Sequence, residues 1–226
     1  MTRAAADHVP LAPAPPADDA TLLARIGAVE ARMRTRRTVR DFDTRPVPRA
    51  VIVAAIRIAG GAPNGANLQP WHFVAIGDPA TKARIREGAE EEERTFYAGR
   101  AGEDWLDALA PLGTDASKPF LAEAPWLIVV FGERRTKDPS GKLVKPYYVP
   151  ESVNIAIGFL IAALHEAGLA TLTHTPAPMG FLNAICGRPT GDKPYVLLVV
   201  GHPKPDAMVP RRAFWKKPLD EIATFM

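Results

Sequence analysis

Apolar residues along the chain follow two periods, one typical of helices and one typical of strands. Positions that recur every three to four residues predict helices at 19–34, 47–59, 79–100, 105–109, 151–169 and 181–186. Continuous apolar runs of strand length predict buried strands at 71–76, 125–131, 169–173 and 195–200. Because strands and helices alternate, the pattern predicts an α/β sandwich in which helices cover a sheet.

Three further stretches add to this picture. Residues 151–169 are apolar nearly all round, so this helix is expected inside a domain or at a dimer interface. Segment 132–146 is charged and rich in turn residues, which predicts a mobile surface loop. Beyond residue 210 the chain carries Phe214, Trp215 and Phe225. Aromatic side chains on a terminal extension need burial, which a partner subunit can provide.

The composition is that of an ordinary globular domain. Of 226 residues, 47% are apolar and 23% charged, and the net charge is +3. We predict a disordered tail at 1–19 and one folded domain at 20–226. The most apolar stretch, 155–164, is far shorter than the ~20 residues that cross a bilayer. The single cysteine excludes an intrachain disulfide. A cytoplasmic protein without a membrane span is therefore expected.

The densest chemistry lies at the start of this domain, where three guanidiniums and a hydroxyl fall within five residues: Arg36, Arg37, Thr38 and Arg40. A guanidinium offers a planar fork of donors to a phosphate or carboxylate. Between residues 25 and 49, eight arginines face three acids, which suits a small anionic ligand such as a phosphate monoester. Nucleic acid is not expected, because a broad basic stripe with interleaved aromatics is missing. The alternative is a solvated basic face at a helix end.

Two other groups of residues suggest a binding site. Small residues in the loop 63–66 let backbone approach a flat ligand closely, although an ordinary turn explains the spacing equally well. Glu93 and Tyr97 are four apart, so they share one helix face and can act on one object, with Lys118 further on. The alternative for this set is a surface helix with one buried tyrosine and a remote lysine.

Several reaction classes have no motif in the sequence. A dinucleotide glycine fingerprint, a phosphate P-loop and a serine nucleophile elbow are missing. The five histidines lack metal-ligand spacing, so no metal is expected. Cys186 lies in an apolar helix and is expected to be inert. With no obvious nucleophile or general base, the chain suits a site where a cofactor carries the hard chemistry.

Taken in order, these motifs resemble a known family. Residues 36–40, 62–66 and 69–71 resemble the flavin-binding segments of the nitroreductase superfamily. Glu93, Tyr97 and Lys118 resemble the substrate clamp of its iodotyrosine deiodinase-like reductive dehalogenases. The resemblance runs from about Arg36 to Ile222. It implies a mixed sheet flanked by helices, and an intertwined homodimer with FMN at each subunit interface.

The resemblance also implies roles for individual residues. FMN would be bound by Arg36, Arg37, Thr38, Arg40, Pro63, Asn64, Gly65, Thr173, His174 and Thr175. Thr175 would offer its hydroxyl to flavin N5, which makes it the expected catalytic residue. The family's C-terminal arginine, which binds the flavin phosphate, is replaced here by Lys216. Lysine keeps the positive charge but lacks the planar fork of donors of a guanidinium. The substrate would contact Ala66, Glu93, Tyr97 and Lys118.

These expectations lead to one hypothesis and two alternatives. The hypothesis is an FMN-dependent reductase that dehalogenates halotyrosine or related halophenols. Glu93 would accept from the substrate ammonium, and Lys118 and Tyr97 would donate to its carboxylate. NAD(P)H or a partner reductase would supply electrons. One alternative is a broad-range NAD(P)H nitroreductase or quinone reductase, and the other is a non-catalytic flavin-binding protein.

Overall fold

A computed structural model describes residues 8–226, and the chain divides into two compact units, 1–35 and 36–226. In the first unit, helix α1 (Asp19–Arg34) forms where the sequence predicts it, and the Asp18 carboxylate caps it by accepting from the Thr21 N–H at 2.8 Å. Residues 8–18 have no regular secondary structure. Residues 1–7 of the predicted tail lie outside the described part, so disorder at 1–19 stays a prediction.

The second unit is built on a four-stranded sheet in the order β1 (Trp71–Ile76), β2 (Trp126–Gly132), β6 (Lys193–Gly201) and β5 (Ala170–His174). All three strand pairs are antiparallel. A parallel contact exists at the β5 edge, where Thr38 forms an isolated bridge with Thr171. β1 and β5 are therefore the two edge strands of the sheet, and the arginine motif runs beside β5.

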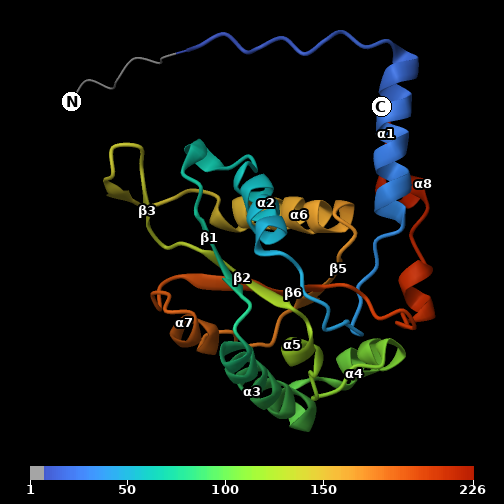
Figure 1. Cartoon of the computed structure of the whole chain (residues 1–226), viewed down its shortest axis with the longest axis vertical. Helices are drawn as coiled ribbons and strands as arrows, with labels where there is room; N and C mark the ends of the chain where they lie inside the picture. The colour runs from blue at the N-terminus through green and yellow to red at the C-terminus, as the bar shows by residue number, and fades with distance from the viewer. Residues whose placement is uncertain (1–7) are drawn as a thin grey trace. The chain divides into compact units, whose positions relative to one another are not determined.

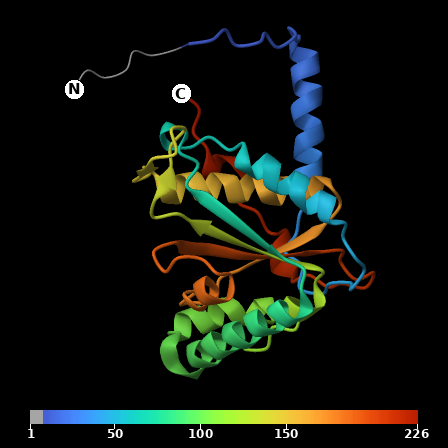
Figure 2. The same ribbon diagram turned by 60° about the vertical axis from the view of Figure 1, so that its left-hand side comes forward.

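Helices cover both faces of this sheet, as Figures 1 and 2 show. One face packs against α2 (Arg49–Gly60) and α6 (Val149–Glu166). The other packs against α3 (Pro79–Thr95), α5 (Phe120–Glu123) and α7 (Phe181–Ile185). Alternate β2 residues enter the two cores, which explains why the β2 sequence is apolar throughout rather than alternating. The predicted α/β layering is thus the observed one.

The segment 132–146, predicted to be a loop, contains a two-stranded hairpin of β3 (Thr136–Lys137) and β4 (Leu143–Val144). Its turn is closed by one side chain, because Asp138 Oδ1 accepts from the N–H groups of Ser140 and Lys142 at 2.9 and 3.0 Å. Carboxylates that bind their own turn stabilise such hairpins, although the strands are too short to appear in an apolar pattern.

The acidic helix predicted to reach Arg100 also differs. The α-helix ends at Thr95, and one π-helical turn, η2 (Phe96–Arg100), follows it and contains Gly99 at φ 147°. Only glycine adopts this backbone angle without strain, so the helical path ends there. The chain continues through α4 (Glu103–Leu109) and a 3₁₀ turn, η3 (Ala110–Leu112), before it reaches α5.

The remaining elements are short. A 3₁₀ turn, η1 (Gly65–Asn67), follows α2, and η4 (Arg211–Phe214) and α8 (Leu219–Ile222) lie near the C-terminus. Phe214, Trp215 and Phe225 are 58%, 64% and 84% exposed, so this chain alone does not bury the C-terminal aromatics. Among residues 8–226, no helix has both the length and the apolar character that a bilayer span requires.

Candidate functional site

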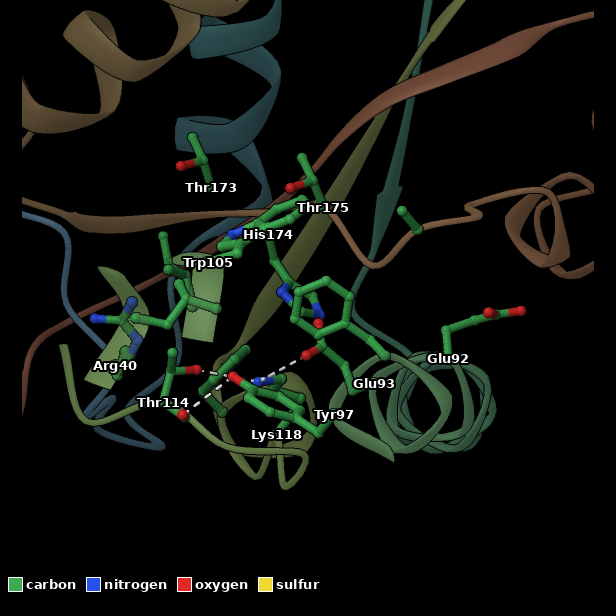
Figure 3. Close-up of a pocket in the computed structure, with 15 residues that line it drawn as sticks. Arg40, Glu92, Glu93, Tyr97, Trp105, Thr114, Lys118, Thr173, His174 and Thr175 are labelled. Carbon is green, nitrogen blue, oxygen red and sulfur yellow. Dashed lines mark hydrogen bonds and ion pairs between the residues drawn. The ribbon is translucent and has the colours of Figure 1, made fainter. Parts of the chain in front are cut away.

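A cavity of about 240 Å³ opens where α3 and η2 approach the end of β5. Figure 3 shows the residues that line it. They come from five separate segments: the arginine motif, the end of α3 with η2, α4, the stretch that leads into α5, and β5 with the turn after it. Seven residues predicted from the sequence are among them: Arg40, Glu93, Tyr97, Lys118, Thr173, His174 and Thr175.

The three predicted clamp residues lie together in the lining of this cavity. Lys118 Nζ is 3.3 Å from Glu93 Oε2, and it also lies 5.7 Å from the centroid of the Tyr97 ring. The side chains of Lys118 and Glu93 are 3% and 14% exposed. The structure therefore brings together residues that are 25 positions apart in sequence, and it encloses the ion pair almost completely.

Thr114, which is not among the residues predicted from the sequence, connects two of these residues. Its carbonyl oxygen accepts from the Tyr97 hydroxyl at 3.0 Å, and its Oγ1 lies 3.1 Å from Lys118 Nζ. The Asp115 carbonyl accepts from the same amine. Burial raises the pKa of Tyr97, so its hydroxyl remains a donor at neutral pH. A threonine in a loop without apolar periodicity gives no signal that would have identified it.

At the end of β5, alternate side chains point to opposite sides of the strand. In Figure 3 the Thr173 and Thr175 side chains lie on one side and the His174 ring lies on the other. The His174 ring packs edge-on to Phe120 at 5.6 Å between centroids and is 8% exposed. The threonine hydroxyls are thus presented together, and His174 approaches the cavity from the side of the clamp.

His174 is neutral at physiological pH. Burial, followed by the positive charges of Lys118 and Arg40, lowers its pKa to about 3. Its Nε2 is buried and has no hydrogen-bond partner within residues 8–226. A neutral imidazole adds no third positive charge beside Lys118 and Arg40.

The arginine motif reaches the cavity through its last member. Thr38 bridges Thr171, and the Val39 N–H donates to the Thr171 carbonyl at 3.3 Å, which fixes the segment against the β5 edge. Arg40 then lines the cavity. Burial lowers the pKa of Arg40, against the opposing effect of Tyr97 and Asp41. A partly desolvated guanidinium at this position favours binding of an anion.

Arg37 points to the C-terminal segment instead. Its guanidinium lies 4.6 Å from the centroid of the Phe214 ring, and its Nη1 donates to the Arg36 carbonyl at 2.7 Å. Lys216, two residues after Phe214, is exposed, and its amine donates to the carbonyls of Ala213 and Trp215. Lys216 therefore belongs to the same C-terminal segment as Phe214, the residue that contacts Arg37 of the arginine motif.

The loop with Pro63, Asn64, Gly65 and Ala66 is held in an unusual conformation. Asn64 Oδ1 accepts from the Gln69 N–H at 2.7 Å, and Nδ2 donates to the Ala62 carbonyl at 3.1 Å. A Cβ atom at Gly65 would lie 2.7 Å from the Tyr147 carbonyl oxygen. Ala66 has φ 53°. The Asn64 side chain is thus used to build its own loop, which leaves the loop backbone as the surface offered to a ligand.

Within one chain, this loop does not meet the cavity. The loop precedes β1, whereas the cavity lies at the end of β5, and these strands form opposite edges of the sheet. Three strand spacings separate them by roughly 14 Å. Gly65 also contacts Ser152 in the first turn of α6, which covers the opposite face of the sheet from α3. The predicted flavin-binding residues therefore fall into two distant groups.

One acid of the run Glu90–Glu93 was missed. The sequence pattern points only to Glu93, yet the Glu90 side chain is 18% exposed and accepts from the Lys118 N–H at 2.8 Å. Its position three residues before Glu93 puts it on the same helix face, which is the signal that was available.

For Cys186, burial raises the pKa to about 11, which agrees with the expected inert thiol.

Comparisons with known proteins identify the family of this chain. The nitroreductase family model matches residues 33–202. An iodotyrosine deiodinase of Haliscomenobacter hydrossis is 52% identical over 178 residues, which cover 79% of this chain and 80% of that protein. An iodotyrosine deiodinase of Nematostella vectensis is 44% identical over 191 residues, covering 84% and 72%.

A solved structure extends the agreement to three dimensions. The crystal structure of oxidized iodotyrosine deiodinase bound to FMN and 3-iodo-L-tyrosine matches with a TM-score of 0.72 and 31% sequence identity. The match covers 84% of this chain and 96% of that one. The predicted fold class is confirmed by this likeness. Since the family model spans three quarters of the chain and a relative is 52% identical over 178 residues, the chain belongs to the nitroreductase family.

Proposed function

We propose that this protein is an FMN-dependent oxidoreductase that removes halide reductively from halotyrosine or a related halophenol. The observation that carries the proposal is the enclosed Glu93–Lys118 pair, with Tyr97 beside it, in a cavity next to Arg40 and Thr175. The iodotyrosine deiodinases at 52% and 44% identity, and the FMN-bound structure, support the same reaction and cofactor.

The clamp is suited to an amino acid zwitterion. Glu93 and Lys118 neutralise each other at 3.3 Å in a nearly dry environment. A ligand with a single charge would separate them and leave one buried charge unpaired, which costs several kcal/mol. A zwitterion supplies both charges, so its ammonium can pair with Glu93 while its carboxylate pairs with Lys118 and Tyr97. Halotyrosine brings this zwitterion together with an aromatic ring.

The residues around the cavity fit FMN. Arg40 is a partly buried cation that lines the cavity, Thr173 and Thr175 add hydroxyls from alternate positions at the end of β5, and Thr38 lies at the β5 edge beside Thr171. Arg36, Arg37 and Lys216 would contribute further positive charge to the phosphate, and His174 would contribute as a neutral group. FMN, when bound, would supply the electrons for dehalogenation. We assign to Thr175 the role of offering its own hydroxyl to flavin N5.

We also propose a homodimer, in which a second copy completes each site. The loop 63–66 lies roughly 14 Å across the sheet from the cavity, so another chain must bring it to the flavin. Apolar surface for such an interface is present on α6, where Ile155 and Phe159 are each 41% exposed, and at Trp215 and Phe225. The predicted all-round apolar character of α6 is consistent with this arrangement.

The source of electrons and the cellular location belong to the same proposal. NAD(P)H or a partner reductase would reduce the cofactor, and we expect the protein in the cytoplasm, where a reducing environment suits its lone cysteine.

The test uses purified protein loaded with FMN. We expect iodide release from 3-iodotyrosine with dithionite as reductant, and turnover that exceeds nitrophenol reduction under the same conditions. Nitrophenol reduction without iodide release would instead support the broad-range nitroreductase. FMN binding with neither activity would support a non-catalytic flavin-binding protein.

A further inference from the structure

The backbone of Lys118 is held by a second carboxylate of α3. Glu90 Oε1 accepts from the Lys118 N–H at 2.8 Å, and the same oxygen accepts from Arg86 Nε at 2.7 Å. These three residues connect α3 to a segment 28 positions further along the chain. Between Glu90 and Lys118 the chain passes through η2, α4 and η3, so their hydrogen bond joins the start and the end of this segment.

Lys118 is therefore fixed at both ends of its side chain. Glu90 holds its backbone, while Glu93 and Thr114 hold its amine at 3.3 and 3.1 Å. Glu90 and Glu93 are one helical turn apart on one face of α3, so one rigid element defines both contacts. Burial opposes ionisation of Glu90, but the Lys118 N–H and the Arg86 guanidinium lower its pKa overall, which keeps the acceptor charged.

We propose that Glu90, oriented by Arg86, is a positioning residue that sets Lys118 for recognition of the substrate carboxylate. This role rests on the proposed function of the cavity, because it assumes a zwitterionic substrate. Lys118 is 2% exposed, so loss of the Glu90 acceptor leaves a buried N–H unsatisfied. The backbone at Lys118 then shifts toward another acceptor, and the amine moves away from the place where a carboxylate binds.

Three variants of the FMN-loaded protein test this role: Glu90→Ala, Glu90→Gln and the control Glu87→Ala. Glu87 is an exposed acid one turn earlier on the same helix. Each protein is titrated with 3-iodotyrosine by flavin fluorescence, and its dissociation constant for FMN and its dithionite-driven turnover of 2-iodophenol are measured in parallel. Iodophenol has the halogenated ring but no ammonium or carboxylate, so it does not use the clamp.

We expect Glu90→Ala to weaken 3-iodotyrosine binding about tenfold or more, as the loss of a charge-assisted hydrogen bond implies. FMN affinity and 2-iodophenol turnover should stay within about twofold of wild type. Glu90→Gln should recover much of the affinity, because its amide oxygen can still accept from the Lys118 N–H. Glu87→Ala should behave like wild type.

Three results would overturn the role, and the third would overturn the proposed function with it. Equal weakening of 3-iodotyrosine binding, FMN binding and 2-iodophenol turnover by Glu90→Ala would mean that Glu90 only maintains the fold. Unchanged 3-iodotyrosine affinity in Glu90→Ala would mean that Lys118 does not depend on it, while leaving the proposed function intact. If the wild-type protein itself fails to bind 3-iodotyrosine, the proposed function and this role fall together.

Discussion

The amine of Lys118 lies 3.3 Å from the carboxylate of Glu93, and less than a sixth of either side chain is exposed. Glu93 lies in the last turn of α3, whereas Lys118 lies in the segment before α5. Each charge is the main compensation for the other. A buried pair of this kind responds strongly to the removal of one partner, because the remaining charge stays desolvated.

Replacing Glu93 tests the clamp directly. We expect Glu93→Gln to weaken 3-iodotyrosine binding at least about tenfold, because the substrate ammonium loses its ionised partner. The free energy of unfolding should fall by about 2 kcal/mol, since the Lys118 amine loses its counter-ion and keeps only neutral acceptors. Ligand titration and urea denaturation measure the two effects. Glu91→Gln is the control, because that side chain is 68% exposed. Wild-type affinity in Glu93→Gln would rule out the clamp.

His174 predicts a specific dependence of stability on pH. Its pKa is lowered to about 3 in the folded protein, compared with about 6.5 for an unfolded chain. Between these values the unfolded state binds more protons, so stability falls as the pH drops below about 6.5. From pH 6.5 to 5 this residue should account for roughly 2 kcal/mol.

Urea denaturation at pH 7 and pH 5 measures that contribution. The difference between the two pH values should be smaller for His174→Asn than for wild type. His202→Asn serves as the comparison: burial also lowers the pKa of His202, but this side chain is only partly buried, so its replacement should change the difference less. An identical pH dependence in wild type and His174→Asn would show that the imidazole titrates normally.

Gly65 predicts a steric effect on the loop proposed to face the flavin. A methyl group there would lie 2.7 Å from the Tyr147 carbonyl oxygen and 3.1 Å from the Tyr148 ring. We expect Gly65→Ala to cost about 1–3 kcal/mol of stability and to weaken FMN binding, because backbone must move to relieve the contact. Gly180→Ala is the matched control, since a methyl group at Gly180 meets no atom within 4 Å. If Gly65→Ala bound FMN with wild-type affinity, the result would show that this loop does not contact the cofactor.

The shared site predicts complementation between two defective chains. Arg40→Ala removes the cavity side of the site and Gly65→Ala disturbs the loop side, so each homodimer should bind FMN poorly. When the two chains are coexpressed, mixed dimers contain one site with both parts intact, which restores binding at about one site in four. Sedimentation and flavin absorbance measure the assembly and its cofactor content. A monomer in solution, or no recovery on mixing, would contradict the shared site.

The apolar pattern alone located most of the fold. It placed the strands near their observed bounds because β2 and β6 are covered on both faces and must be apolar throughout. It failed at β3 and β4, where two-residue strands depend on the Asp138 turn, and at Thr95, where Gly99 redirects a helix whose charge pattern continues. In both places local hydrogen bonds or backbone angles decide the structure, and neither produces a hydrophobic period.

For the site, the sequence determined which residues carry chemistry, since guanidiniums, acids and a lysine are visible as residue types and their order resembles a family. Tertiary structure alone decided which of them meet. It joined Glu93 to Lys118, added Thr114 and Glu90 to that pair, and put the loop 63–66 at the opposite edge of the sheet. The distances between side chains depend on strand order and helix packing. The position of a residue in the sequence does not by itself specify either of these.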